Sequence, residues 1–154
     1  MPTLNQWLND YGESHKNQTN KTIHWVCVPA IFLSITGFLY SIKLPFYFAN
    51  HHINMALIIL FIILIYYFTL SKTLWIGMFV FAFFCLLICH LVSLYLFIPI
   101  WAFSILVFIA AWTGQFYGHK LEGNKPSFLK DLKFLLIGPA WLMSFIYQKV
   151  GIEL

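Results

Sequence analysis

The sequence predicts an all-α membrane protein, a polytopic bundle of four to five transmembrane helices preceded by an N-terminal interfacial helix. Of its 154 residues, 61% are hydrophobic and only 9% are charged, whereas a soluble domain carries roughly 25% charged residues. Its apolar runs approach the roughly 20 residues that a helix needs to cross a bilayer. The sequence contains no linker and no internal repeat, so residues 1–154 are expected to form a single integral membrane domain.

The first element expected is a short helix at the membrane surface over residues 3–13. Its apolar residues recur at helical spacing, at Leu4, Trp7, Leu8 and Tyr11. A single apolar stripe of this kind is typical of a helix with one buried face. The segment has no basic stretch ahead of an apolar run, so we do not expect a cleaved signal peptide.

Four spanning helices are expected from the apolar stretches that follow. The first covers residues 23–42, with a kink or a loosened start at Pro29. A loop over residues 43–53 leads to a second span at 54–70. Residues 74–117 are about twice the length of one span, so two helices must share them. We place the break near 95–99, because proline is tolerated in a first helical turn and disfavoured in a helix interior.

The C-terminal part is predicted to be helical but not assigned to a membrane crossing. Residues 127–136 are amphipathic, and a short apolar segment follows over residues 134–147, interrupted by Gly138 and Pro139. A spanning segment and a re-entrant segment are both consistent with this pattern.

Charge is sparse and carried by lysine. The chain has nine lysines, no arginine and a net charge of +4, so it lacks the guanidinium groups suited to phosphate and base edges, and nucleic acid is not an expected partner. Seven lysines fall in the N-terminal segment, the turn at Lys72 and the loop at 118–134. By the positive-inside rule this face is cytoplasmic. The expected location is a bacterial inner membrane, or the endoplasmic reticulum of a eukaryote.

Two polar clusters lie where membrane helices are expected to begin or end. The N-terminal cluster comprises His15, Asn17, Asn20 and His24. The C-terminal cluster comprises Gln115, His119 and Glu122, which share one helix face if the helix continues past Gly118. Four crossings return the chain to its starting face, so we expect the two clusters to meet.

Three imidazoles and a carboxylate at the bilayer edge are costly to desolvate unless they bind something. The metal-ligating and catalytic residues are therefore predicted to be His15, His24, His119 and Glu122, with Glu122 either as fourth ligand or directly beside the ligands. Imidazole with carboxylate suits iron, zinc or manganese, and two histidines with one carboxylate suit oxygen chemistry at Fe(II). The amides expected to orient these ligands are Asn17, Asn20 and Gln115. The alternative is that each histidine only anchors a helix end.

The remaining histidines and cysteines are given structural roles. We expect His90 to hydrogen-bond to a neighbouring helix, and the loop pair His51 and His52 to be solvated. Three cysteines, Cys27, Cys85 and Cys89, fall inside predicted spans, where small polarizable side chains pack helices together. Their odd number implies no disulfide framework.

The two motifs together resemble the fungal 2-hydroxy fatty acid dioxygenase family of phytosphingosine degradation and its bacterial relatives. The N-terminal pattern, His-x-Asn-x-x-Asn-x-x-x-His and then proline, is present at His15, Asn17, Asn20, His24 and Pro29. The C-terminal pattern, Gln-Phe-x-Gly-His and then glutamate and proline, is present at Gln115, Phe116, Gly118, His119, Glu122 and Pro126. The fungal pattern has one more residue between the histidine and the glutamate, and a later fungal glutamate has no counterpart here.

The resemblance implies a membrane Fe(II) dioxygenase that uses O2 to remove one carbon from a 2-hydroxy fatty acid, or that acts on a related hydroxylated lipid. Its substrate tail would remain in the lipid bilayer. One alternative is a zinc-dependent membrane hydrolase with Glu122 as general base. Another is a lipid-binding protein without catalytic activity, in which the polar clusters only hold helix ends. Assembly into a homo-oligomer is left open.

Overall fold

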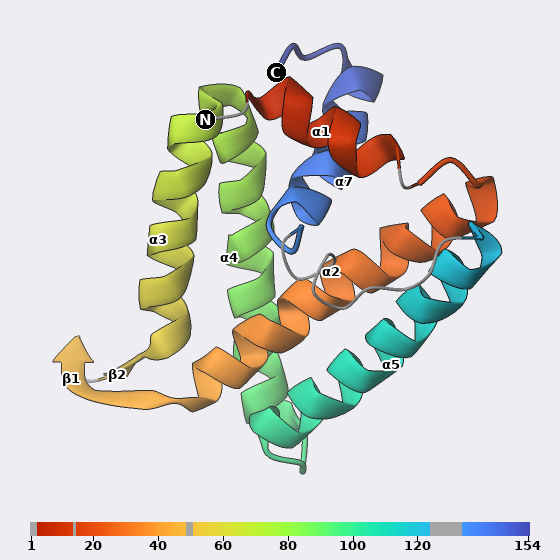
Figure 1. Cartoon of the computed structure of the whole chain (residues 1–154). Helices are drawn as coiled ribbons and strands as arrows, with labels where there is room; N and C mark the ends of the chain where they lie inside the picture. Colours follow the sequence, from red (N-terminus) through yellow and green to blue (C-terminus); the bar gives the residue numbers. More distant parts are fainter. Residues whose placement is uncertain (1–2, 14, 49–50, 124–133) are drawn as a thin grey trace.

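The computed structural model describes residues 3–13, 15–48, 51–123 and 134–154, with the side chains of residues 48 and 51 excepted. Helices dominate the chain, and two short strands join the second helix to the third (Figure 1). In chain order the elements are α1 (Leu4–Glu13), α2 (Gln18–Ser41), β1 (Lys43–Phe48), β2 (His51–Asn54), α3 (Met55–Leu70), α4 (Lys72–Tyr95), α5 (Ile100–Leu121) and α7 (Ile137–Val150). The predicted all-α class, the short helix at the N-terminus and the break between α4 and α5 are confirmed.

Three of these helices are long and apolar enough to cross a membrane, namely α2, α4 and α5. Helix α3 has 16 residues and is therefore about 24 Å long, somewhat short of a hydrocarbon core of about 30 Å. Helix α7 has only 14 residues. The apolar composition and these three helices are consistent with a membrane protein.

Helices α2 and α5 lie side by side in opposite directions and form the most extensive helix pair of the fold (Figure 1). Two glycines permit this approach. A Cβ atom at Gly114 would lie 2.7 Å from Sγ of Cys27, and a Cβ atom at Gly37 would overlap Oγ of Ser104. Small residues that let two backbones approach closely are typical of membrane helix packing. The pairing brings the start of α2 to the end of α5.

Helix α2 begins at Gln18, five residues earlier than predicted from its apolar run. Asn17 causes this earlier start, because its side chain accepts hydrogen bonds from the amides of Thr19 and Asn20. Asparagine is among the best N-cap residues. The first, polar turns of α2 therefore extend the helix beyond its apolar run.

The segment expected to be a loop over residues 43–53 instead forms an antiparallel hairpin of β1 and β2. β1 contains Phe46, Tyr47 and Phe48, and aromatic residues favour strands. Pro45 lies in the irregular part of the pairing, between the partnered positions Lys43 and Tyr47, where its missing N–H removes no regular ladder bond.

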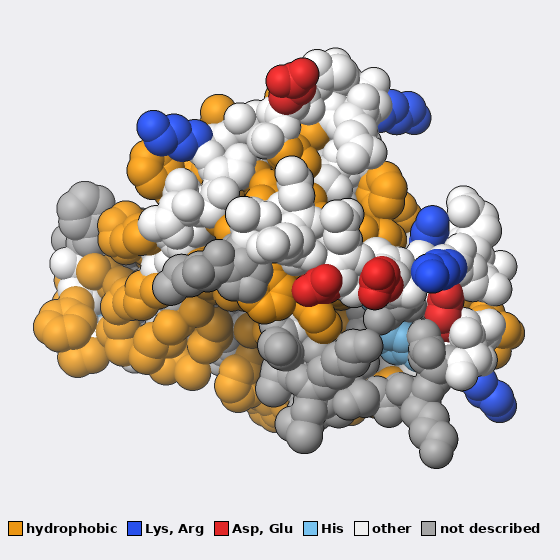
Figure 2. All heavy atoms as spheres, turned by 45° about the horizontal axis from the view of Figure 1, so that its top comes forward, with side chains coloured by type: hydrophobic (Ala, Val, Ile, Leu, Met, Phe, Trp, Pro, Cys, Tyr) orange, Lys and Arg blue, Asp and Glu red, His pale blue; other side chains and the backbone are white. Residues whose placement is uncertain are grey.

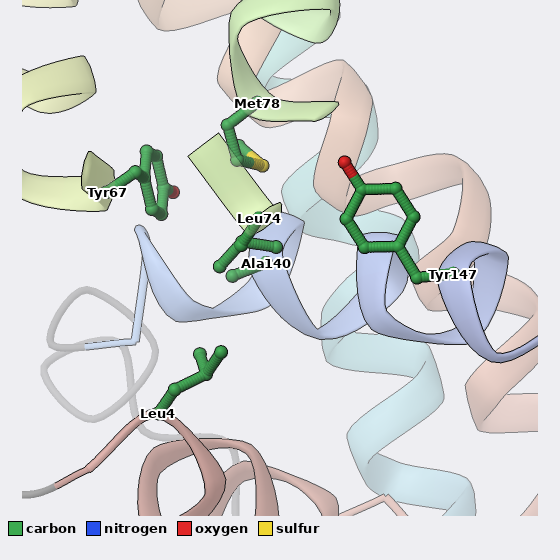
Figure 3. Packing of buried hydrophobic residues seen from close by; sticks show 6 residues of the cluster. All are labelled: Leu4, Tyr67, Leu74, Met78, Ala140 and Tyr147. Atoms are coloured by element: carbon green, nitrogen blue, oxygen red, sulfur yellow. The ribbon is translucent and has the colours of Figure 1, made fainter. Parts of the chain in front are cut away.

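Helix α7 packs against the bundle end near α3 and α4, and it begins with the residues predicted to interrupt it. Gly138 and Pro139 are its second and third residues, and proline is tolerated in a first helical turn. Figure 3 shows the apolar cluster that α7 shares with α1, α3 and α4, made of Leu4, Tyr67, Leu74, Met78, Ala140 and Tyr147. Most of the predicted amphipathic segment at 127–136 lies outside the described residues.

Two tyrosines of this cluster form hydrogen bonds that hold the α7 region against α3 and α4. The hydroxyl of Tyr67, which is fully buried, donates to the carbonyl of Leu136, directly ahead of α7. The hydroxyl of Tyr147, in α7, donates to the carbonyl of Thr73 at the start of α4, at 2.9 Å. In Figure 2, charged side chains lie on the face that includes α1 and α7, and apolar side chains gather at the lower left of this view.

Candidate metal centre

Three buried histidines meet where the C-terminal end of α1, the start of α2 and the end of α5 come together. His15 lies in the connection between α1 and α2, His24 in α2 and His119 in the last turn of α5. Their exposed fractions are 3%, 1% and 6%. One ligand nitrogen from each ring can be chosen so that all three lie within 4.8 Å of one another. The two polar clusters of the sequence therefore meet, as predicted.

His15 is held in place by Tyr11, one helical turn earlier. Nδ1 of His15 lies 2.7 Å from the carbonyl oxygen of Tyr11, and a carbonyl can only accept, so Nδ1 carries the proton. The tyrosine ring stacks on the imidazole, with centroids 4.2 Å apart and planes 18° from parallel. In the neutral ring, Nε2 is then the nitrogen that carries the lone pair.

His24 has the same arrangement within α2. Its Nδ1 lies 2.9 Å from the carbonyl oxygen of Asn20 and must donate to it. Its Nε2 faces Nε2 of His15 at 3.0 Å. When both rings are neutral, two lone pairs point at each other with no proton between them. Such a pair requires either a proton or a cation between the two nitrogens.

The distances fit a metal ion. Two nitrogens bound to one ion at about 2.0–2.1 Å each, at roughly a right angle, are about 3 Å apart. Metal-bound histidines commonly donate their second ring nitrogen to a backbone carbonyl or a carboxylate, as His15 and His24 do here. The ring of His119 completes the group, with its centroid 5.5 Å from that of His15 and 5.1 Å from that of His24.

Glu122 lies beside this group rather than inside it. Its two carboxylate oxygens accept hydrogen bonds from the amides of Lys16 and Asn17 and from Nδ2 of Asn20, at 2.6 to 3.0 Å. Partial burial raises the pKa of Glu122, but these hydrogen bonds outweigh that effect, and the pKa lies below its ordinary value. Glu122 is therefore ionised at neutral pH.

The amides predicted to orient the histidines occupy three different positions. Asn17 caps α2, and its side chain contacts main-chain amides of that helix. Asn20 is fully buried and orients His24 through its carbonyl, while its side chain donates to Glu122. Gln115 is buried one turn before His119 and borders a small cavity of about 20 Å³.

His90 and His52 lie on other elements, and the side chain of His51 lies outside the described residues. His90 of α4 pairs with the hydroxyl of Tyr40 in α2, with 3.1 Å between Nδ1 and the oxygen, as predicted for a hydrogen bond to a neighbouring helix. His52 is exposed on β2, where its ring lies against Tyr47. The cysteines are free and buried. Within the described parts of the chain, the three histidines are the only group of His, Cys, Asp and Glu that could hold a metal ion.

An open cleft of about 1190 Å³ runs between α1 and α7 and reaches His15. Its lining combines apolar side chains, among them Leu8, Trp141 and Phe145, with Lys16, Lys21, Glu13 and Glu153. Drug-sized ligands typically occupy sites of about 300–1,000 Å³. The volume of the cleft exceeds this range, and its lining includes His15 of the candidate metal centre.

Sequence reasoning missed two contributors to this site. Tyr11 orients His15, and Trp141 of α7 lies beside the same ring, with centroids 5.5 Å apart. Tyr11 precedes His15 by four residues, the spacing that also separates Asn20 from His24, so this repeated interval was a usable signal. Trp141 had no such signal, because its position depends on how α7 packs.

Comparison with protein-family models matches residues 1–150 to the family described as 2-hydroxy-palmitic acid dioxygenase Mpo1-like. No curated protein and no solved structure matches the chain.

Proposed function

The chain belongs to the 2-hydroxy-palmitic acid dioxygenase Mpo1-like family, and on this basis we propose that it is a membrane-embedded, Fe(II)-dependent dioxygenase. Its substrate would be a 2-hydroxy fatty acid or a related hydroxylated lipid, from which one carbon is removed. The overall conversion balances with O2 as co-substrate, giving a fatty acid one carbon shorter, CO2 and water. The family description supports the substrate class, and the histidine centre supports the metal dependence.

The observation that carries the proposal is the pair of facing nitrogens on His15 and His24. Both rings donate their Nδ1 protons to main-chain carbonyls, so the two Nε2 atoms face each other at 3.0 Å, and one ring nitrogen from each of the three histidines lies within 4.8 Å of the others. Anchoring of helix ends would not require that convergence. We propose that these three histidines hold the iron, and iron when bound would supply the redox chemistry with O2.

The protein's own residues would then bind and orient the lipid. The cleft between α1 and α7 leads to His15 and would admit the polar end of the substrate. Lys16 and Lys21 line it, and their positive charge would attract the carboxylate of the substrate. Trp141 and Phe145 offer apolar surface to the adjoining carbons. Holding the hydroxy acid beside the centre would contribute to catalysis by bringing the reacting groups together in a fixed orientation.

We propose that the centre lies on the cytoplasmic side of the membrane. Lys16, Lys21, Lys72 and Lys120 all lie at the ends of helices on the side of the bundle that holds the histidines, whereas Lys43 begins the hairpin at the other end of α2. An excess of lysine marks the cytoplasmic side. The substrate would then approach from the cytoplasmic leaflet.

Elemental analysis combined with an oxygen electrode tests the proposal. Protein purified in detergent without added metal should contain iron close to one per chain, consume O2 when given a 2-hydroxy fatty acid, and release the acid one carbon shorter. Zinc without O2 uptake would replace the proposal with a hydrolase. A protein that binds the lipid but neither metal would indicate a carrier without catalytic activity.

A further inference from the structure

Glu122 was expected either to bind the metal or to lie directly beside its ligands, and its hydrogen bonds favour the second role. We propose that Glu122 is a positioning residue. Its carboxylate links the end of α5 to the start of α2 and to the connection that carries His15. This inference concerns the site of the proposed function and rests on it, and its test does not depend on catalytic activity.

The first support is that both oxygens of the carboxylate are already used. Oε1 accepts from the amides of Lys16 at 2.6 Å and Asn17 at 3.0 Å, and Oε2 accepts from the amide of Asn17 and from Nδ2 of Asn20, each at 2.9 Å. Hydrogen bonds to an ionised acceptor are about twice as strong as neutral ones. The carboxylate also lies at the N-terminus of α2, where the helix dipole favours negative charge. Binding a metal would compete with these bonds.

The second support is which residues these bonds hold. Lys16 directly follows His15, so its amide fixes the main chain that carries that ligand. Asn20 provides the carbonyl that orients His24, and its side chain is fixed by Glu122. Glu122 itself is the C-cap of the helix that carries His119. One carboxylate thus connects the three chain segments that supply the histidines.

The third support is that the side-chain amide of Asn20 cannot be flipped without losing its hydrogen bond to Glu122. Its Nδ2 must face the carboxylate, and its Oδ1 is buried against Gly118, with no hydrogen-bond donor among the described residues. A buried carbonyl without a donor is unfavourable, because it loses its hydrogen bonds to water. The hydrogen bond to Glu122 offsets that cost and sets the orientation of the Asn20 side chain.

An exchange of donor and acceptor tests the assignment. In Glu122→Gln the new NH2 group must face either the NH2 group of Asn20 or the main-chain amides of Lys16 and Asn17, so a donor meets a donor in both orientations. In Asn20→Asp two carboxylates face each other. The double variant Asn20→Asp/Glu122→Gln restores one donor and one acceptor with their positions exchanged. Affinity for Co(II) is measured by chelator competition, and the Co(II) absorption spectrum reports the ligand set. Asp10→Asn, which removes an exposed carboxylate from α1, is the matched control.

A positioning role predicts that each single variant binds Co(II) about 10- to 100-fold more weakly, that the double variant recovers most of the loss, and that the spectrum keeps its shape throughout. A changed spectrum in Glu122→Gln, or a double variant no better than the single ones, overturns the proposal.

If the natural protein binds no metal, the proposed function fails. The positioning role is then decided on metal-free protein by amide hydrogen exchange at Lys16 and Asn17, which should be faster in both single variants and slow again in the double variant.

Discussion

Gly118 of α5 lies directly against the side-chain amide of Asn20 in α2, and a Cβ atom at position 118 would overlap Oδ1 of Asn20. Gly118→Ala should therefore force α5 away from the start of α2. Overpacking of this kind costs about 1–3 kcal/mol, and here the strain falls one residue before His119. We expect a lower thermal midpoint and a weaker metal affinity, measured by thermal unfolding and by chelator competition.

Thr113→Ala is the matched control for that substitution. Thr113 is exposed on the same helix, and its hydroxyl bonds to the carbonyl of Ile109 within α5. The control should leave metal affinity unchanged. Equal losses of metal in both variants would mean that the site does not depend on the close approach of α2 and α5.

Removal of a ligand should be more damaging than removal of an amide beside it. His15→Ala, His24→Ala and His119→Ala should each lose stoichiometric metal, whereas Gln115→Ala should weaken binding by about 10- to 100-fold. His52→Ala and His90→Ala should retain the metal, because both rings lie elsewhere in the fold. The metal content of all six variants is measured after gel filtration. Metal loss in His52→Ala or His90→Ala would mean that the site has been assigned to the wrong histidines.

The proposed orientation in the membrane can be tested with single exposed cysteines. Gln18→Cys and Lys120→Cys should react with an impermeant maleimide from the cytoplasmic side, and Tyr47→Cys, in the hairpin, from the opposite side. All three positions are exposed, whereas the natural cysteines are buried. Labelling of positions 18 and 120 from opposite sides would be incompatible with one shared centre.

The lysines of the cleft should affect substrate binding more than turnover. Lys21 is half-buried in the lining, and Lys21→Gln should raise KM for a 2-hydroxy fatty acid several-fold while kcat changes little. Binding interactions that are equal in the ground and transition states behave in this way. Lys149→Gln removes an exposed charge from α7 outside the cleft and should leave both constants unchanged.

The two buried tyrosine hydroxyls should contribute measurably to the docking of α7. Tyr67→Phe leaves the carbonyl of Leu136 without its donor, which should cost about 1–3 kcal/mol of unfolding free energy. Tyr147→Phe should cost less, because Tyr147 is slightly more exposed than Tyr67. Limited proteolysis near residue 136 should also accelerate. If neither variant changes stability, α7 is held by apolar packing alone.

The sequence predicted the helices well because long apolar runs and their polar breaks determine membrane helices directly. It failed where a few residues decide the outcome. The start of α2 depends on one asparagine cap, at Asn17, outside the apolar run. The first strand of the hairpin after α2 carries aromatic residues, which favour strands, within the stretch predicted to be a loop. Gly138 and Pro139 look like an interruption in the sequence, although both are acceptable in the first turn of α7.

For the site, the spacing of polar residues predicted that two distant segments meet, and the three histidines do come together. The partner of each group could not be predicted, because a residue four positions away offers both a side chain and a carbonyl. The structure shows that the carbonyl of Asn20 orients His24, and that the side chain of Asn20 binds Glu122 instead. Sequence spacing places residues on one face but does not decide which atoms pair.

The positions of the three histidines along the chain have a consequence for biosynthesis. Residues 15 and 24 leave the ribosome early, whereas residue 119 follows only after α5 has been made, so no nascent chain can complete the centre before most of its helices exist. Until then His15 and His24 can offer two nitrogens at most. Metal can thus be bound by all three histidines only after α5 has joined the bundle. A chain truncated ahead of α5 should reach the membrane without its metal.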